Sequence, residues 1–219
     1  IWDWVGGRFS IWSTVSISVA LKIGMENFRQ FLLGGYEMDK HFRVAPISEN
    51  LPIILALIGI WNINLENINN HLILPYDNRL KKFPAFIQQL DMESNGKSVS
   101  LDGNALLHKT GPIVFGGLGT DSQHTFFQSL HQGSHSISSD FILVSAPDHS
   151  INGHHHELLA NALGQARALM QGRTIEETNC NLHQVSCGNH PSNTILIRKL
   201  DPMNLGRLIA LYEHKIFVQ

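Results

Sequence analysis

The sequence has few of the features that mark secreted, membrane-bound or nucleic-acid-binding proteins. Only Cys180 and Cys187 are cysteines among 219 residues, too few for a secreted disulfide framework and compatible with a reducing cytoplasm. Lys and Arg (16) nearly balance Asp and Glu (18), so the net charge of −2 offers no basic excess for a phosphate backbone or an anionic membrane. The longest apolar run, residues 51–60 continued to Ile63, is too short to span a bilayer. We therefore expect a cytoplasmic protein that binds neither nucleic acid nor membranes.

Hydrophobic residues make up 43% of the chain, and they follow an alternating pattern. Short strand-like runs are separated by stretches of helical periodicity, which predicts an α/β fold: a three-layer, doubly wound, mostly parallel sheet. The strands are expected at residues 72–74, 113–115, 141–144 and 194–197. Ligands of such folds bind at the carboxyl ends of the strands, which points to the loops after these four runs.

The helices are expected between these strands and at both ends of the chain. The first is expected over residues 10–33, with a break near Gly24 and a stop at Gly34-Gly35. Further helices are expected over residues 52–65, 79–89, 155–171 and 203–214, with a small hairpin about Asp102-Gly103. Residues 91–97 are expected in a loop. Neither end carries an initiator Met, a leader or a capped final helix, and the chain is expected to be truncated at both ends.

Residues 88–97, Gln-Gln-Leu-Asp-Met-Glu-Ser-Asn-Gly-Lys, concentrate carboxylates, amides and an ammonium group around a glycine. They can be a solvated loop that closes a helix at Asn95-Gly96. They can also hold a catalytic base, with Glu93 moving a proton on a bound substrate. Spacing alone leaves both interpretations open.

Arg8 and His124 are two further candidates for catalysis. Arg8 follows Gly6-Gly7, which would let the backbone pass close to a ligand, and its guanidinium could stabilise developing negative charge or simply pair with Asp3. His124 is expected in the first turn of a helix starting near Asp121, where the helix dipole favours neutral imidazole, or as a packing residue.

Two histidine-containing segments could in principle bind a metal ion. Adjacent residues of His154-His155-His156 point about 100° apart on a helix, so they cannot share one ion as an i, i+4 pair can. The Cys180-Asn-Leu-His183 and Cys187-Gly-Asn-His190 pairs could form a structural zinc site, but a domain of this size folds without metal. We expect no metal and no cofactor.

Several segments together resemble the glucose-6-phosphate isomerase family over essentially the whole chain. The two most specific are Asp-Met-Glu-Ser-Asn-Gly-Lys at residues 91–97 and Tyr-Glu-His-Lys-Ile-Phe-Val-Gln at residues 212–219. The other matching stretches are residues 3–10, 38–42, 74–77, 110–114, 123–124 and 131–133. This sequence departs from the family pattern at Gly117-Leu118, where Glu-Pro is usual, and at His190, where Arg is usual.

The resemblance implies a cofactor-independent aldose–ketose isomerase of glycolysis and gluconeogenesis, a cytoplasmic homodimer built from two sugar-isomerase (SIS) subdomains. Glu93 then resembles the base that shuttles a proton between C2 and C1 through a cis-enediolate, and Arg8 the cation that stabilises it. His124 resembles the ring-opening residue, contributed across the dimer interface, and Gly7 and Gln89 resemble residues that line the sugar-phosphate site.

The resemblance also implies how much of the protein is present. Residues 1–46 are expected to be the end of the first SIS subdomain and residues 47–219 the second, without its final segment. The family's phosphate loop and ring-opening lysine have no match here, so we expect the 219-residue chain alone to show little activity. A non-catalytic sugar-phosphate-binding SIS module and a zinc-binding interaction module are the alternatives.

Overall fold

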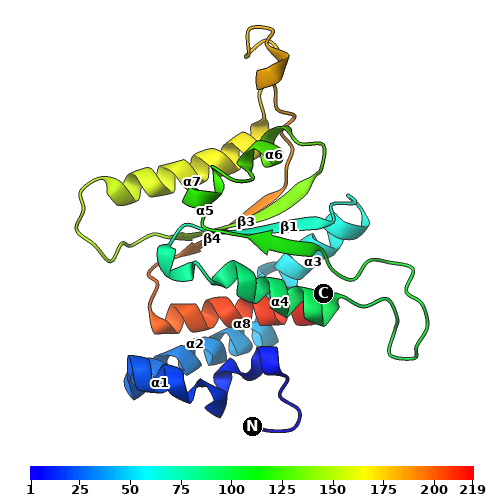
Figure 1. Cartoon of the computed structure of the whole chain (residues 1–219). Coiled ribbons are helices and arrows are strands. Elements are labelled where there is room, and N and C mark those ends of the chain that lie inside the picture. Colours follow the sequence, from blue (N-terminus) through cyan, green and yellow to red (C-terminus); the bar gives the residue numbers. More distant parts are fainter. The chain divides into compact units, whose positions relative to one another are not determined.

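The computed structural model describes all 219 residues, which form two compact units (Figure 1). Unit 1 consists of Ile1–Trp61, Gln89–Gly111 and Leu200–Gln219, and unit 2 of Asn62–Gln88 and Pro112–Lys199. Each unit is therefore built from segments that are distant in the sequence. The expected subdomain boundary near residue 46 stays a prediction.

Unit 2 contains a four-stranded parallel sheet. Its strands are β1 (Asn70–Pro75), β2 (Ile113–Gly116), β3 (Ile137–Val144) and β4 (Ser192–Ile197). They lie in the order β2-β1-β3-β4, and every neighbouring pair is parallel. The prediction of an α/β fold with a parallel sheet is confirmed, and each of the four expected strands is present.

Helices α6 (Phe127–Gln132) and α7 (His154–Gln171) pack on one face of this sheet, as Figure 1 shows. The buried cluster between them consists of Leu72, Leu74, Tyr76, Phe127, Leu130, Ile137, Phe141, Leu143, Ala162 and Leu169. The alternation of side chains along a strand sends Leu72 and Leu74 to this face and Ile73 to the other. Within unit 2, helix α4 (Phe83–Asn95) contacts β2, where the Gln88 side chain donates a 2.9 Å hydrogen bond to Val114 O.

Unit 1 is helical. Its elements are η1 (Gly7–Trp12), η2 (Thr14–Ser16), α1 (Ile17–Ile23), α2 (Met25–Val44), η3 (Ile47–Glu49), the first part of α3 (Leu51–Asn64), the end of α4, and α8 (Pro202–Val218). The expected break at Gly24 is present, with φ at +83°. The expected stop at Gly34-Gly35 is wrong, because α2 continues to Val44. These glycines serve close packing instead: a Cβ at Gly34 would lie 1.9 Å from Met203 O on α8.

Three shorter elements complete the chain: η4 (Asn78–Leu80), α5 (Gly119–Ser122) and η5 (Leu182–Gln184). The hairpin about Asp102-Gly103 is reduced to one antiparallel bridge, Val99 to Ala105, with Gly103 at φ +78°. No helix combines the length and apolar character needed for a membrane span.

Candidate functional site

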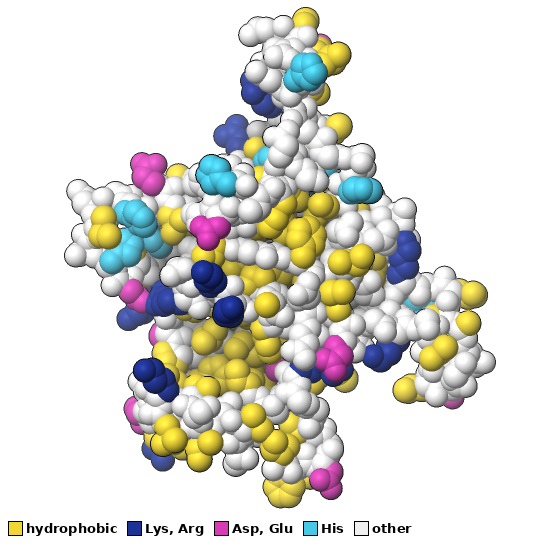
Figure 2. Space-filling view, viewed as in Figure 1, with side chains coloured by type: hydrophobic (Ala, Val, Ile, Leu, Met, Phe, Trp, Pro, Cys, Tyr) yellow, Lys and Arg dark blue, Asp and Glu magenta, His cyan; other side chains and the backbone are white.

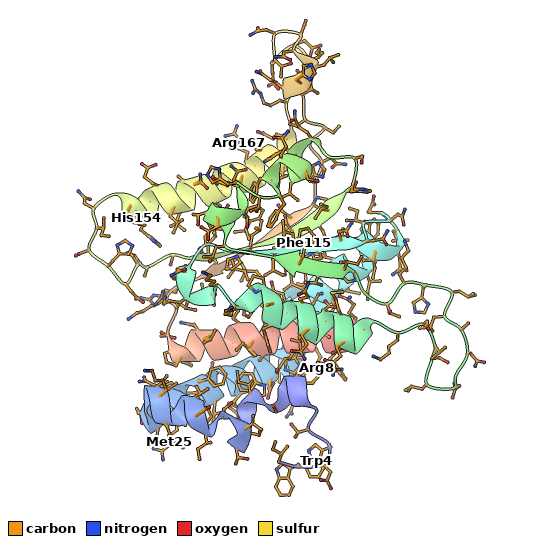
Figure 3. All side chains as sticks on the ribbon, viewed as in Figure 1. Trp4, Arg8, Met25, Phe115, His154 and Arg167 are labelled. Atoms are coloured by element: carbon orange, nitrogen blue, oxygen red, sulfur yellow. The ribbon has the colours of Figure 1, made fainter.

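Arg8 and Glu93 lie side by side in unit 1. Arg8 Nη1 is 3.1 Å from Glu93 Oε1, and Arg8 Nε donates a 2.8 Å hydrogen bond to Ser94 Oγ. Figure 3 shows Arg8 next to the C-terminal part of α4, which carries both partners. Two candidates separated by 85 positions in the sequence are thus brought together, and the alternative pairing of Arg8 with Asp3 is not the one observed.

The expected loop over residues 91–97 is wrong in its first part, because α4 extends to Asn95. Helical spacing then places Gln89 one turn before Glu93 on the same face. Gln89 Nε2 donates a 3.2 Å hydrogen bond to Glu93 Oε2, so each carboxylate oxygen of Glu93 has its own partner. Lys97 Nζ donates to Glu93 O at 2.7 Å and so fixes the backbone of the same residue.

Gly7 is the first residue of η1 and directly precedes Arg8. A Cβ built on Gly7 would meet no atom within 4 Å, so the backbone borders open space there. The Glu93 side chain is 56% exposed and that of Arg8 23%. A base and a fixed positive charge therefore stand together where a ligand can reach them, which suits proton abstraction beside a carbonyl group.

His124 belongs to unit 2. The expectation that it sits in the first turn of a helix is wrong: α5 begins at Gly119 and ends at Ser122, and His124 occupies the turn that follows. At the start of this helix Gly119 packs on the Tyr76 ring so closely that a Cβ would lie 2.0 Å from it. His124 is exposed, and the helix-dipole argument does not apply to it.

The carboxyl ends of β1, β2 and β3 form a cavity of about 470 Å³ within unit 2, whereas the loop after β4, which was also expected to contribute, does not line it. The loops after β1, β2 and β3 contribute to it through Asp77 and Arg79, Leu118, and Asp148, respectively. Arg79 pairs with both aspartates and lowers the pKa of Asp77, mainly through their hydrogen bond. Burial raises the pKa of Tyr76, which also lines the cavity, to about 12, so its phenol is neutral.

Histidines gather at one end of this cavity. Figure 2 shows them together where the loop before α7 meets that helix, and the rings of His149 and His154 lie 5.2 Å apart. His155 Nε2 is 2.8 Å from Val144 O, so that ring is already engaged by the backbone. No group of three or more His, Cys, Asp or Glu side chains is arranged to hold a metal ion, and Cys180 and Cys187 are both exposed and free.

The structure adds contacts between α8 and the elements that carry Arg8 and Glu93. Trp12 Nε1 donates a 2.7 Å hydrogen bond to Glu213 Oε2, while Glu213 Oε1 is buried without a partner. Burial raises the pKa of Glu213 to about 7; the Trp12 hydrogen bond opposes this rise and the charge of Asp39 adds to it.

A second contact joins α8 to α4 in the same unit. Lys215 Nζ lies 2.8 Å from Asp91 Oδ2, and both side chains are buried. Glu213 and Lys215 both lie in residues 212–219, one of the two most specific matching stretches. Nothing in the sequence indicates which residue either of them contacts.

Comparison with known proteins finds one protein family that matches the whole chain. The family model described as phosphoglucose isomerase matches residues 1–219. The chain belongs to the phosphoglucose isomerase family. A glucose-6-phosphate isomerase of Shewanella putrefaciens is 48% identical over the entire chain, and so is that of Shewanella oneidensis.

Two solved structures have a similar fold, and one of them is a member of this family. A glucose-6-phosphate isomerase from Chlamydia trachomatis superimposes with a TM-score of 0.94 at 39% identity and covers 100% of the chain. A hypothetical protein from Thermus thermophilus, at 21% identity and a TM-score of 0.78, shares the fold. The chain spans 43% of the length of the Shewanella and Chlamydia phosphoglucose isomerases.

Proposed function

We propose that this chain carries the proton-transfer centre of an isomerase that interconverts glucose 6-phosphate and fructose 6-phosphate. The observation that supports it most is the contact of Arg8 with Glu93, on which Gln89 also converges. The names of the Shewanella and Chlamydia relatives supply the substrate and the reaction.

In the proposed reaction the Glu93 carboxylate removes the proton from C2 of the open-chain aldose. The electrons of that C–H bond form the C1–C2 double bond, and the carbonyl oxygen at C1 becomes an oxyanion. Arg8 supplies fixed positive charge beside this developing charge. The hydroxyl proton of O2 passes to the oxyanion at O1, which leaves the negative charge on O2. The cis-enediolate is planar, so Glu93 reaches C1 from the same face and returns the proton there, while the electrons on O2 form the C2 carbonyl of the ketose.

Gly7 and Gln89 complete the centre. The open space beside Gly7 leaves room for the sugar next to Arg8, and the Gln89 hydrogen bond holds one oxygen of Glu93 while the other faces Arg8. Both oxygens of the base thereby keep a fixed orientation, which is what proton transfer between adjacent carbons requires.

Ring opening of the cyclic substrate is assigned to His124, which would act from the second subunit of a homodimer. Its exposure at the end of the α5 turn supports this role, because an exposed imidazole can approach a neighbouring chain. We also propose that the protein acts in the cytoplasm, in glycolysis and gluconeogenesis, and that it needs no cofactor.

Replacement of the base tests the proposal in the intact protein. With Glu93→Gln we expect exchange of the C2 proton with solvent to fall a hundredfold or more, since a positioned base contributes about 10²–10⁴-fold, while hexose 6-phosphate still binds. Glu26→Gln, a similar change at an exposed site on α2, is expected to leave exchange unchanged.

Normal exchange in the Glu93→Gln protein would remove Glu93 from the mechanism. Binding of hexose 6-phosphate by the unaltered protein without any proton exchange would instead favour a non-catalytic SIS module. Exchange is followed by NMR in deuterated water and binding by isothermal titration calorimetry, so the two outcomes are separate.

A further inference from the structure

Helix α8 contacts both elements that carry the Arg8–Glu93 pair. The direct contacts between those elements are made by the Arg8 side chain, with Glu93 and Ser94. η1 is a six-residue 3₁₀ helix, and such short pieces are not stable in isolation. Glu93 is more than half exposed, so burial does not fix its side chain. The contacts that hold the two backbones therefore also determine how these side chains meet.

The η1 segment is held through Trp12, its last residue. The indole stacks on Phe31 of α2, with ring centroids 4.7 Å apart, and it lies against Gly35 so closely that a Cβ there would be 2.7 Å from the ring. Its N–H donates to Glu213 Oε2 on α8 at 2.7 Å. The stacking contacts permit the ring to slide in its plane, whereas the hydrogen bond fixes its direction.

The end of α4 is held through Asp91, two residues before Glu93. Asp91 is fully buried and pairs with Lys215 of α8, which is 4% exposed. Asn95 of α4 adds hydrogen bonds of 3.4 Å to Ile216 O and 3.3 Å to Asp91 Oδ1. Lys215 and Ile216 therefore hold the last turn of α4, on which Glu93 stands.

Glu213 and Lys215 are two positions apart on α8, so their side chains leave the helix about 200° from each other. They consequently reach elements on opposite sides of α8. We propose that α8 positions the two partners of the catalytic pair, with Glu213 setting Arg8 through Trp12 and Lys215 setting Glu93 through Asp91. This inference rests on the proposed function, because it assigns positioning residues to the same centre.

A positioning role differs measurably from a role in stability alone. Arg8 stabilises charge that develops only in the transition state, so misplacing it lowers kcat and leaves KM nearly unchanged. A purely structural loss lowers the amount of folded protein, and kcat per folded molecule stays constant. A residue that acts through Arg8 also loses its effect once Arg8 is gone.

The proposed role of Glu213 is tested in the intact protein with Glu213→Leu, which removes the acceptor of the Trp12 N–H. We expect kcat to fall tenfold or more with KM within twofold, and Glu213→Gln, which keeps an acceptor oxygen, to restore kcat to within threefold. In an Arg8→Ala background, Glu213→Leu is expected to cause no further fall. Leu169→Ala, a core change on α7 of unit 2, is the control for destabilisation and is expected to keep the unaltered kcat per folded molecule.

If Glu213→Leu does not fold, Trp12→Phe removes the same hydrogen bond and keeps a stacked ring, and it is expected to lower kcat severalfold without changing KM.

The role of Lys215 is tested with the double change Lys215→Met with Asp91→Leu, because a single change would leave a buried charge. We expect kcat to fall tenfold in that protein, although it remains folded.

Equal effects of Glu213→Leu in the presence and absence of Arg8 would overturn the Glu213 half, and an unaltered kcat in the Lys215/Asp91 double variant would overturn the other. Either result leaves the Glu93→Gln exchange experiment unaffected. Normal proton exchange with Glu93→Gln would instead refute the proposed function itself, so the two failures are distinguishable.

Discussion

Gly34 of α2 and Gly206 of α8 face each other's helix with no room for a methyl group. A Cβ at Gly34 would lie 1.9 Å from Met203 O, and one at Gly206 would lie 2.2 Å from Phe31 O. Both obstacles are backbone oxygens, which cannot rotate away as a side chain can. The crossing of α2 and α8 is therefore a direct approach of two backbones.

Gly206→Ala is expected to destabilise the chain for this reason. Forcing a methyl group against a backbone oxygen must separate the helices, and overpacking of this kind costs about 1–3 kcal/mol or more. Urea denaturation followed by circular dichroism measures the change in the free energy of unfolding.

The matched control is Gly164→Ala on α7, where an added Cβ meets nothing within 4 Å. Alanine has the higher helix propensity, so this change is expected to stabilise the chain by about 0.5–1 kcal/mol. Equal stability of the two variants would show that the α2–α8 crossing tolerates separation.

Glu213 is expected to make the stability of the chain depend on pH. Its pKa is about 7 in the folded chain against 4.5 for an ordinary glutamate, so between these values the folded state binds a proton that the unfolded state has released. This stabilising contribution is complete below about pH 4.5 and is lost as pH rises through 7, by up to about 3 kcal/mol.

Glu213→Gln removes this titration and keeps an oxygen for the Trp12 N–H. The free energy of unfolding of the unaltered chain is expected to fall relative to that of Glu213→Gln between pH 5 and pH 8. Denaturation at several pH values measures the difference. Parallel curves for the two proteins would mean that Glu213 is ionised in the folded chain at all of them.

Asp140, within the sheet of unit 2, is a second position at which a substitution is expected to destabilise the chain. It is 2% exposed, accepts a 2.8 Å hydrogen bond from Asn193 Nδ2, and has Oδ2 3.1 Å from His71 Nε2. Asp140→Ala removes the acceptor of the Asn193 side chain and the carboxylate beside the buried His71 ring, and it is expected to cost about 3 kcal/mol.

Asp102→Ala, an equivalent change in an exposed turn, is expected to stay within about 0.5 kcal/mol of the unaltered chain. Thermal denaturation of both variants provides the comparison. A small effect at Asp140 would indicate that water replaces the lost carboxylate.

The alternating pattern of the sequence predicts the strands well because each contains a short apolar run between polar segments. It fails where distant packing overrides local preference. Gly34-Gly35 has the local signature of a helix end, yet α2 continues because the helix needs small residues where α8 and Trp12 approach it. The polarity of residues 91–97 likewise predicts a loop, but Asp91 is buried by its ion pair with Lys215 and the helix extends beyond it.

The candidate centre shows the same limit. Their residue types and sequence context make Glu93 a candidate base and Arg8 a candidate for stabilising negative charge. The family resemblance selects them over other acidic and basic residues. The contact of Gln89 with Glu93 is a local consequence of α4, whereas the contact of Arg8 with Ser94 joins segments 86 positions apart. The roles of Trp12 and Glu213 depend on a contact across 201 positions, which no local pattern reveals.

The Trp12–Glu213 contact has a consequence for synthesis of the chain. Ribosomes release the N-terminal residues first, so η1 emerges long before α8 exists to hold it. Contacts of such long sequence separation form late in folding, because a large loop must close first. If α8 positions the pair as proposed, Arg8 and Glu93 adopt their mutual orientation only after translation has passed residue 215, and nascent chains halted earlier should lack the pair even where the sheet of unit 2 has already formed.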